Sequence, residues 1–243
     1  MSMLQTSELV KKYKKAEVVS GVSIQIKEGE IVGLLGPNGA GKTTTFYMIT
    51  GMITPSSGRV TLDEQEITNM PMYKRAKLGI AYLAQEASVF TKLSVEDNLR
   101  LALEFTPLSK EEQKNRLEKL LEEFSIAHKR RNIANTLSGG ERRRTEIARS
   151  LVSDPKFILL DEPYAGIDPI AVDEIQKIIL KLKEKGIGVL ITDHNVRETL
   201  SITDRSYLLY EGKVLFSGSS KDLSEDEEAR RLYLGDRFKM ESR

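Results

Sequence analysis

The stretch IVGLLGPNGAGKTTT, residues 31–45, constrains the fold more strongly than any other part of the sequence. It begins as a continuous apolar run, typical of a strand buried on both faces. It then fits the phosphate-loop pattern G-x-x-x-x-G-K-[ST] ahead of a predicted helix. Glycines in such a loop let consecutive backbone N–H groups turn toward phosphate oxygens, and the helix start adds positive potential. We therefore expect an α/β protein that binds phosphate at the end of a strand.

Two side chains of this loop suit a nucleotide with its metal. Lys42 is expected to reach the β and γ phosphates, and the Thr43 hydroxyl is expected to ligate Mg²⁺. A plain strand-turn-helix connection can match the pattern by chance, so a second element is needed to support the assignment. The loop residues predicted to bind the nucleotide are Gly36, Pro37, Asn38, Gly39, Ala40, Gly41, Lys42, Thr43 and Thr44.

A second apolar run, FILLDE at residues 157–162, ends in two carboxylates. Ligands of open α/β sheets bind at the carboxyl ends of the strands. Asp161 fits a role in holding Mg²⁺ through water, and Glu162 is placed to orient or deprotonate an attacking water. Such a pair alone is more often a solvated strand end. Together with the phosphate loop, it favours a nucleotide site.

Two further polar residues follow apolar runs. Gln85 comes after IAYLA and His194 comes after VLITD, so each is expected at a strand end that faces the nucleotide. A lone glutamine is usually on the surface, and a lone histidine usually has a structural role. Of the two histidines, His194 is the better candidate for a γ-phosphate contact, while His128 is expected on the surface near a helix end.

The rest of the pattern predicts a mixed sheet with two additions. The first thirty residues alternate short β-prone runs, which predicts an antiparallel layer. GVLIT at residues 188–192 predicts another buried parallel strand, and residues 205–218 predict a hairpin across Glu211 and Gly212. We expect a single domain made of a core (1–86 and 155–219), a helical subdomain (87–154) and a C-terminal helical extension (220–243).

Capping signals mark the expected helices. Ser109 with Glu112 forms an S-x-x-E capping box, and Asp168 followed by Pro169 predicts a helix that ends before Gly186. Apolar residues at i, i+3, i+4 and i+7 form one stripe that is expected to pack in the core. These residues are Leu117, Leu120, Leu121 and Phe124.

Composition narrows the class of partner. The chain has 37 Lys and Arg against 36 Asp and Glu, which gives no global attraction to nucleic acid or to a membrane surface. It has no cysteine, so disulfides and thiolate metal sites are excluded. No apolar run approaches the roughly 20 residues needed to span a bilayer, and the N-terminus lacks the apolar core of a signal peptide. We expect any membrane role to need another chain.

The stretch LSGGE, residues 137–141, poses a separate question because it is a second glycine-rich helix start. Ser138 and Glu141 form an S-x-x-E capping box, which needs no ligand. That account leaves two glycines where one small cap would suffice, and an anion-binding helix end unused. If the helical subdomain is a separate lobe, a phosphate bound at this helix must come from a second copy of the chain.

This combination of motifs resembles the ATP-binding cassette (ABC) ATPases over essentially the whole chain. The resemblance implies ATP and Mg²⁺ as ligands, ATP hydrolysis, and a head-to-tail homodimer in which each signature completes the partner's site. It implies the following roles: adenine stacking for Tyr13, metal and water contact for Gln85, the Walker B aspartate for Asp161, the catalytic glutamate for Glu162, the switch histidine for His194, γ-phosphate contact in trans for Ser138, Gly139 and Gly140, and a place at the dimer seam for Asp168. One departure is Glu141, where glutamine is commoner. A carboxylate near a triphosphate lowers affinity unless it is held away, and the capping box offers a way to hold it.

The flanking sequence points to a particular kind of transporter. YLAQEASVFTKLSVEDNL, LLDEPYAGIDPIAV and the ending ARRLYLGDRF resemble the ATPase subunits of lipopolysaccharide exporters of Gram-negative bacteria. TDHN and DEPYAGIDP are also similar to ATPases of branched-chain amino-acid importers, which remain an alternative. The exporter resemblance implies a cytoplasmic homodimer on the inner face of the inner membrane, bound to the transmembrane proteins LptF and LptG with LptC.

Position suggests where such a partner binds. Val89, Phe90 and Leu93 fall near the start of the helical lobe, where transporter ATPases form a groove for a coupling helix. The alternative is that Phe90 belongs to the ordinary core of the lobe.

Two other classes of protein fit the sequence less well. A soluble ABC protein that acts on DNA would need a long coiled-coil insertion before the signature, and the ribosome-binding type carries two cassettes per chain. A module that binds ATP without hydrolysing it would not need Glu162, His194 and Gln85 together.

Overall fold

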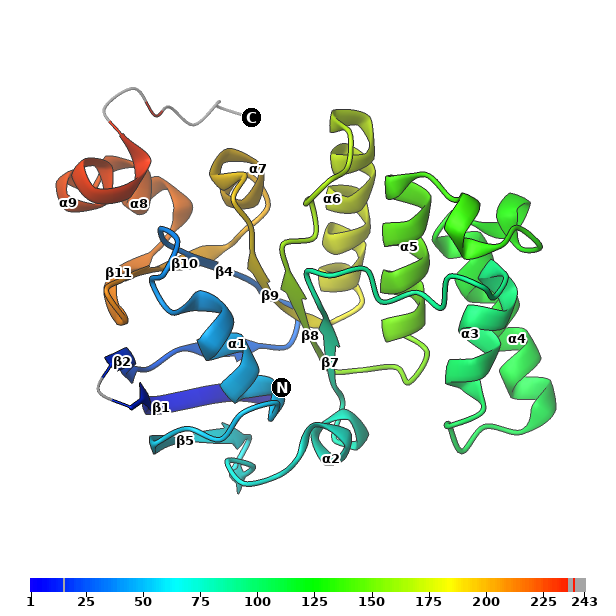
Figure 1. The fold of residues 1–243 in the computed structure, drawn as a ribbon, viewed down its shortest axis with the longest axis horizontal. Coiled ribbons are helices and arrows are strands. Elements are labelled where there is room, and N and C mark those ends of the chain that lie inside the picture. Colours follow the sequence, from blue (N-terminus) through cyan, green and yellow to red (C-terminus); the bar gives the residue numbers. More distant parts are fainter. Residues whose placement is uncertain (15, 236–237, 239–243) are drawn as a thin grey trace.

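The computed structural model describes residues 1–14, 16–235 and 238, and it is built on two β-sheets (Figure 1). The larger sheet has the order β11-β10-β4-β9-β8-β7, in which β11 is antiparallel to β10 and the other neighbours are parallel. Its strands are β4 (Ile31–Leu35), β7 (Ile80–Leu83), β8 (Phe157–Asp161), β9 (Gly188–Thr192), β10 (Arg205–Tyr210) and β11 (Lys213–Gly218). Every residue of β4, β8 and β9 is buried, which confirms the three apolar runs as buried parallel strands.

The smaller sheet is antiparallel, as the first thirty residues predict. Its order is β2-β1-β5-β6, and β3 pairs with β1. The strands are β1 (Met3–Tyr13), β2 (Ala16–Val22), β3 (Gln25–Lys27), β5 (Ser57–Leu62) and β6 (Gln65–Glu66). Helix α1 (Lys42–Thr50) lies between the two sheets in Figure 1 and contacts strands of both.

Three helices on one side of the larger sheet form the lobe that carries LSGGE. They are α3 (Val95–Leu103), α4 (Lys110–Glu123) and α5 (Gly139–Ser150). The capping box at Ser109 and the buried apolar stripe of α4 are confirmed. Helix α6 (Pro169–Glu184) begins after its predicted cap Asp168 and stands between α5 and the strands (Figure 1).

The remaining helices cover the ends of the molecule. They are α2 (Met72–Lys77), α7 (Val196–Leu200), α8 (Ser220–Glu225), α9 (Glu227–Ala229), a π turn (Arg230–Leu234) and two 3₁₀ turns (Ala127–Lys129 and Ala134–Thr136). The helical character predicted from residue 220 onward is therefore confirmed as far as residue 234. Residues 236, 237 and 239–243 of that predicted extension lie outside the described residues.

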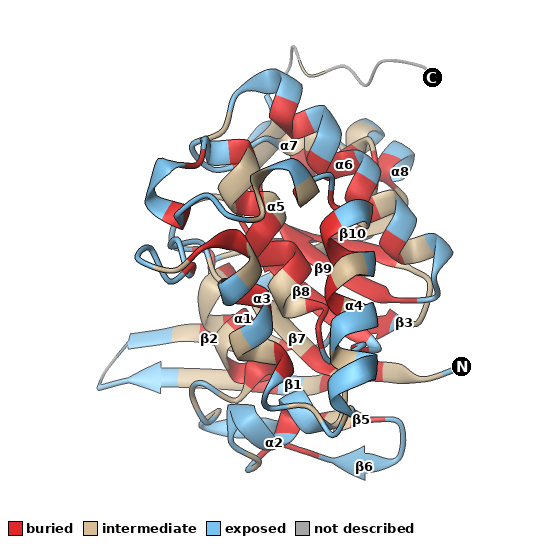
Figure 2. Cartoon of the chain, turned by 90° about the vertical axis from the view of Figure 1, so that its right-hand side faces the viewer, coloured by how far each residue is buried: buried red, intermediate tan, exposed pale blue. Residues whose placement is uncertain are grey.

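The alternation of side chains along the strands divides the core into two faces. In β8, Phe157 and Leu159 join the cluster packed under α1, while Ile158 and Leu160 join the cluster that continues into the lobe. Buried residues consequently run in a continuous band along the strands and the inner sides of α5 and α6, and exposed residues lie on the outer turns (Figure 2). The lobe shares its hydrophobic core with the sheet.

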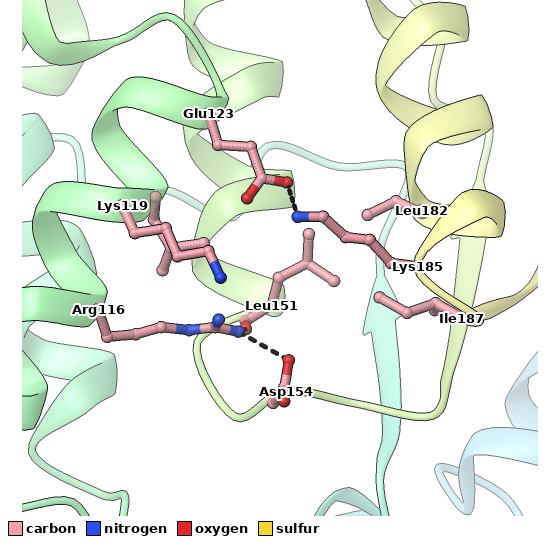
Figure 3. A pocket seen from close by; sticks show the side chains of 9 residues that line it. Arg116, Lys119, Glu123, Leu151, Asp154, Leu182, Lys185 and Ile187 are labelled. Atoms are coloured by element: carbon pink, nitrogen blue, oxygen red, sulfur yellow. Dashed lines mark hydrogen bonds and ion pairs between the residues drawn. The ribbon is translucent and has the colours of Figure 1, made fainter.

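An ion pair at the rim supports this contact between lobe and core. Lys185, just after α6, pairs with Glu123 of α4 (Figure 3). Within the lobe, Arg116 of α4 pairs with Asp154 at 3.0 Å. Between them lies a cavity of about 230 Å³ with an apolar floor that includes Leu151. None of the residues predicted to bind ATP lines this cavity.

The structure contains no helix, among the residues it describes, that is both long and apolar enough to cross a membrane.

Candidate functional site

The phosphate loop connects the buried strand β4 to α1 and is shaped by its own glycines. Gly36 has φ +145, and a Cβ atom there would lie 2.2 Å from the carbonyl oxygen of Leu209, so only glycine fits. Lys42 is buried, and its Nζ donates to the carbonyl oxygens of Gly36 at 2.7 Å and Pro37 at 3.1 Å. The lysine is thus held inside the curve of the loop, where a phosphate would replace the carbonyls as its partner.

The helix start behind this loop lacks a side-chain cap. Gly41 is the N-cap residue of α1 and has no side chain to accept the first N–H groups of the helix. Thr43 and Thr44 follow in the first turn and are half-buried, while Asn38 and Gly39 are exposed at the tip of the loop. Such a helix start is an anion site that takes its partner from a ligand.

Asp161 ends β8 and has one oxygen that suits a metal. The carboxyl group is buried, its Oδ2 accepts from the Tyr82 hydroxyl at 3.2 Å, and its Oδ1 has no hydrogen-bond partner among the residues the structure describes. Burial raises the pKa of Asp161, an effect that Tyr82 and the positive charge of Lys42 oppose. A buried carboxylate oxygen without a donor costs about 1–3 kcal/mol, which a cation would offset. The donors Asp161, Thr43 and Gln85 supply oxygen, as Mg²⁺ prefers.

Glu162, Gln85 and His194 come together although they are far apart in the sequence. Gln85 Nε2 donates to Glu162 Oε2 at 2.7 Å, and His194 Nε2 lies 2.8 Å from Glu162 Oε1. Glu162 itself has φ +49, and its N–H donates to the carbonyl of Thr192 at 2.8 Å. Because Gln85 and Glu162 follow neighbouring parallel strands, their side chains meet at one sheet edge, and His194 closes the group from β9.

Two buried residues of α5, which the sequence analysis missed, hold this edge in place. Arg143 donates to the carbonyl oxygens of Ala84 at 2.9 Å and Asp161 at 3.0 Å. Glu146 accepts the N–H of Ser88 at 2.6 Å and pairs with Arg143 at 3.1 Å. From the sequence alone, the three arginines at residues 142–144 are typical of a solvated helix surface. The helical spacing of Arg143 from Gly140 and Ile147, both buried, is the signal that could have identified it.

The start of α5 confirms the capping box. Ser138 Oγ accepts the Glu141 N–H at 3.3 Å, and Glu141 Oε2 accepts the Ser138 N–H at 2.9 Å. Lys129 Nζ lies 3.2 Å from the other oxygen of Glu141. The Ser138 N–H and Lys129 lower the pKa of Glu141 and hold its charge to one side. The box does not involve the N–H groups of Gly139 and Gly140.

One of the two glycines has a packing role that the sequence analysis did not foresee. A Cβ at Gly140 would lie 2.7 Å from the Cβ of Ala171 in α6, which is too close. Gly140 is buried in this contact, whereas Ser138 and Gly139 are exposed. Gly140 thus permits the close approach of α5 and α6, so a ligand is not its only explanation.

LSGGE and the phosphate loop lie in different parts of the molecule. In Figure 1, α6 and strands β8 and β9 separate α5 from α1. Within one chain, the structure does not bring Ser138, Gly139 and Gly140 to the phosphate loop.

Two predicted residues lie at the margins. Tyr13 ends β1, is 49% exposed, and has Lys11 Nζ 5.3 Å from its ring centroid. Asp168 is exposed and accepts the Ala171 N–H at 3.0 Å as the cap of α6. His128, expected on the surface, is 62% exposed and 3.9 Å from Glu141. The structure leaves the adenine and dimer-seam roles of Tyr13 and Asp168 as predictions.

A further contact to the phosphate loop comes from the C-terminal segment. Tyr233, in the π turn, packs against the cluster that contains Leu35, and burial raises its pKa, an effect that the backbone of Gly36 opposes. Its neighbours Leu223 and Ala229 are buried in a small cluster with Leu35, the last residue of β4. The sequence contains no signal for this contact because it depends on how the terminal helices fold back over β4.

Comparison with known proteins agrees with this geometry. Residues 19–165 match the family model described as ABC transporter. The chain is 51% identical over 241 residues to the lipopolysaccharide export system ATP-binding protein LptB of Haemophilus influenzae, covering 99% of this chain and all of that protein. An ATP-binding cassette of an ABC transporter solved in its ADP conformation superposes with a TM-score of 0.87 at 30% identity, covering 97% of this chain and all of the other. A dimeric cassette with bound ADP and Pi superposes with a TM-score of 0.79 at 27% identity, covering 89% and 98%.

Proposed function

We propose a specific role for this chain, which belongs to the ABC transporter family and hydrolyses ATP to drive transport: it powers the extraction of lipopolysaccharide from the inner membrane for export. The observation that carries the proposal is the 51% identity to an LptB protein across the full length of both chains. In this role the chain lies on the cytoplasmic face of the inner membrane and binds LptF and LptG, with LptC associated.

The nucleotide site is proposed to work with the residues named above. Lys42 and the N–H groups of residues 36–44 hold the phosphates of ATP, and Tyr13 stacks on adenine. When bound, Mg²⁺ neutralises charge on the β and γ phosphates, and Thr43, Asp161 and Gln85 would hold it.

Glu162 is the proposed general base. Its carboxylate is held from both sides by Gln85 and His194, so both partners fix its direction before ATP arrives. A water placed against Glu162 would be oriented for attack on the γ phosphate. His194, more than half exposed, is free on its outer side to contact that phosphate.

The second helix start is proposed to complete the site of another copy. The exposed Ser138 and Gly139 and the N–H groups left outside the capping box would contact the γ phosphate of the partner's ATP, with Asp168 at the seam. A cassette of similar fold solved as a dimer supports this arrangement. Two ATP molecules would then be held between two chains.

Fewer of the residues predicted to bind a membrane partner are accessible than the sequence suggests. Val89 is buried in the lobe core, so its predicted place in the groove is wrong. Phe90 is 50% exposed, and the guanidinium of Arg149 lies 5.2 Å from its ring centroid. We propose that Phe90 and Arg149, beside the half-buried Leu93, form the surface that receives a helix of LptF or LptG.

The decisive experiment is affinity isolation of the chain from detergent-solubilised membranes with identification of its transmembrane partners. We expect LptF and LptG. Recovery of amino-acid importer permeases instead would replace the export role and leave the ATPase activity intact.

Phe90→Ala tests the groove within the same experiment. It should weaken recovery of the transmembrane partners because it removes a central apolar contact. Phe105→Ala is the matched control, since Phe105 is 86% exposed after the end of α3 and outside the groove. Equal recovery with both variants would show that Phe90 is not part of the surface.

A further inference from the structure

Tyr82 contacts the proposed metal site, yet the sequence motifs assign it no role. In β7, Tyr82 and Ile80 point to the face of the sheet that α1 covers, while Leu83 points to the face that the lobe covers. By the same alternation in β8, Asp161 shares the face of Phe157 and Leu159, the face of Tyr82. Because β7 and β8 are paired in parallel, the two side chains meet at the sheet edge.

The two carboxylate oxygens of Asp161 differ in their hydrogen bonding. The Tyr82 hydroxyl donates to Oδ2 at 3.2 Å. Oδ1 is buried and lacks a hydrogen-bond partner within residues 1–14, 16–235 and 238. A carboxylate with one oxygen bonded and the other bare has one preferred rotation about its χ2 bond, and this leaves Oδ1 as the available ligand.

A second tyrosine supports the first. Tyr47 lies on α1, five residues after Lys42, and its ring meets the Tyr82 ring edge to face, with centroids 6.3 Å apart and planes at 84°. This geometry is a favourable one for aromatic pairs. The helix of the phosphate loop, the strand before Gln85 and the strand of Asp161 are thereby joined through side chains.

We propose that Tyr82 is a positioning residue for the metal: its hydroxyl holds Oδ2 of Asp161 so that Oδ1 faces Mg²⁺. The inference rests on the proposed role of Asp161 as a metal-site residue. Phenylalanine at this position would keep the ring contact with Tyr47 and lose only the donor. The carboxylate could then rotate, and the metal would be bound more weakly.

If Tyr82 has a purely structural role, a different effect on metal binding is expected. If the hydroxyl only satisfies a buried carboxylate, its loss lowers the stability of the fold and changes metal binding no more than the loss of another buried tyrosine hydroxyl. Tyr207→Phe provides that comparison. Tyr207 is buried in β10, and its hydroxyl accepts the Gln25 N–H at 3.2 Å.

The test measures Mn²⁺ binding by electron paramagnetic resonance on the full chain with saturating non-hydrolysable ATP analogue. The Mn²⁺ Kd of Tyr82→Phe should rise about 3- to 10-fold, which corresponds to the net effect of one ordinary hydrogen bond. The affinity of Tyr82→Phe for a fluorescent form of the analogue, measured in EDTA without metal, should be unchanged. Tyr207→Phe should alter neither the Mn²⁺ Kd nor this metal-free affinity.

The outcomes separate this inference from the proposed site. An unchanged Mn²⁺ Kd in Tyr82→Phe would overturn the inference, as would an equal change in Tyr207→Phe or an equal loss of metal-free affinity. Asp161→Asn is measured alongside. If it weakens Mn²⁺ binding while Tyr82→Phe does not, only the inference fails. If it also has no effect, the proposed metal role of Asp161 fails first.

Discussion

The starts of α1 and α5 are both glycine-rich, but only the start of α5 is capped by side chains. At α1 the N-cap is Gly41, no side chain caps the helix, and Lys42 is folded over the site. At α5, Ser138 and Glu141 cap the helix themselves, and the surface around Ser138 and Gly139 is exposed. A helix start without a side-chain cap leaves its N–H groups available to a ligand bound by the same chain. A capped and exposed start is stable without a ligand and still presents two N–H groups to another molecule.

The largest expected effect comes from removing the proposed base that serves the α1 site. Glu162→Gln should lower ATP turnover by about 10²- to 10⁴-fold, because amide nitrogen and oxygen cannot take a proton from water. ATP should still bind, so the start of α5 of a second chain should remain in contact with its γ phosphate. Size-exclusion chromatography with saturating ATP should then show a dimer. A monomer under these conditions would contradict the two-chain site, and unreduced turnover would remove Glu162 from its role.

A mixing experiment sharpens the comparison further. Lys42→Ala disables the α1 start, and Gly139→Asp places a carboxylate at the α5 start, so each variant alone should be nearly inactive. A mixed dimer contains one intact site, made of the Gly139→Asp chain's phosphate loop and the Lys42→Ala chain's LSGGE. An equal mixture should recover up to about a quarter of wild-type turnover, given random pairing in a two-fold dimer. If LSGGE served its own chain's nucleotide, mixing would restore nothing.

The packing role of Gly140 predicts a smaller effect on stability. Gly140→Ala puts a methyl group 2.7 Å from the Ala171 Cβ and should lower the free energy of unfolding by about 1–3 kcal/mol. Gly139→Ala meets its nearest atoms at 3.1 and 3.2 Å and should cost less. Urea unfolding followed by circular dichroism measures both. Equal stability of the two variants would show that α6 can move away from α5.

The smallest effect concerns Glu141. Its pKa is lowered in the folded chain, so its contribution to stability is present above the ordinary glutamate pKa of 4.5 and is lost as the pH falls below that value. Glu141→Gln can keep the cap geometry but removes the charge. The variant should be less stable by under about 1 kcal/mol at pH 7, with a difference that shrinks toward pH 3. Thermal unfolding across this range measures it, and a constant difference would rule out the charge as its source.

The capping box of α5 and the phosphate loop could both be predicted because each depends on neighbours within a few residues. Asp161, Glu162, Gln85 and His194 could be placed at one sheet edge because parallel strands end together. Val89 was misplaced because a single apolar residue in a loop does not reveal whether the lobe core or the solvent lies beside it. Arg143 was missed because its partners outside its own helix are backbone carbonyls of two other segments.

The sequence alone determined the family, the strand-loop-helix that receives phosphate and the caps of the main helices, since local spacing controls backbone N–H direction and helix termini. The tertiary structure alone decided which carboxylate oxygen stays bare, why Gly140 must lack a side chain, and that Tyr82 and Tyr233 reach the nucleotide site. These depend on contacts between segments distant in the chain, which are set by how the sheet, α6 and the lobe pack together.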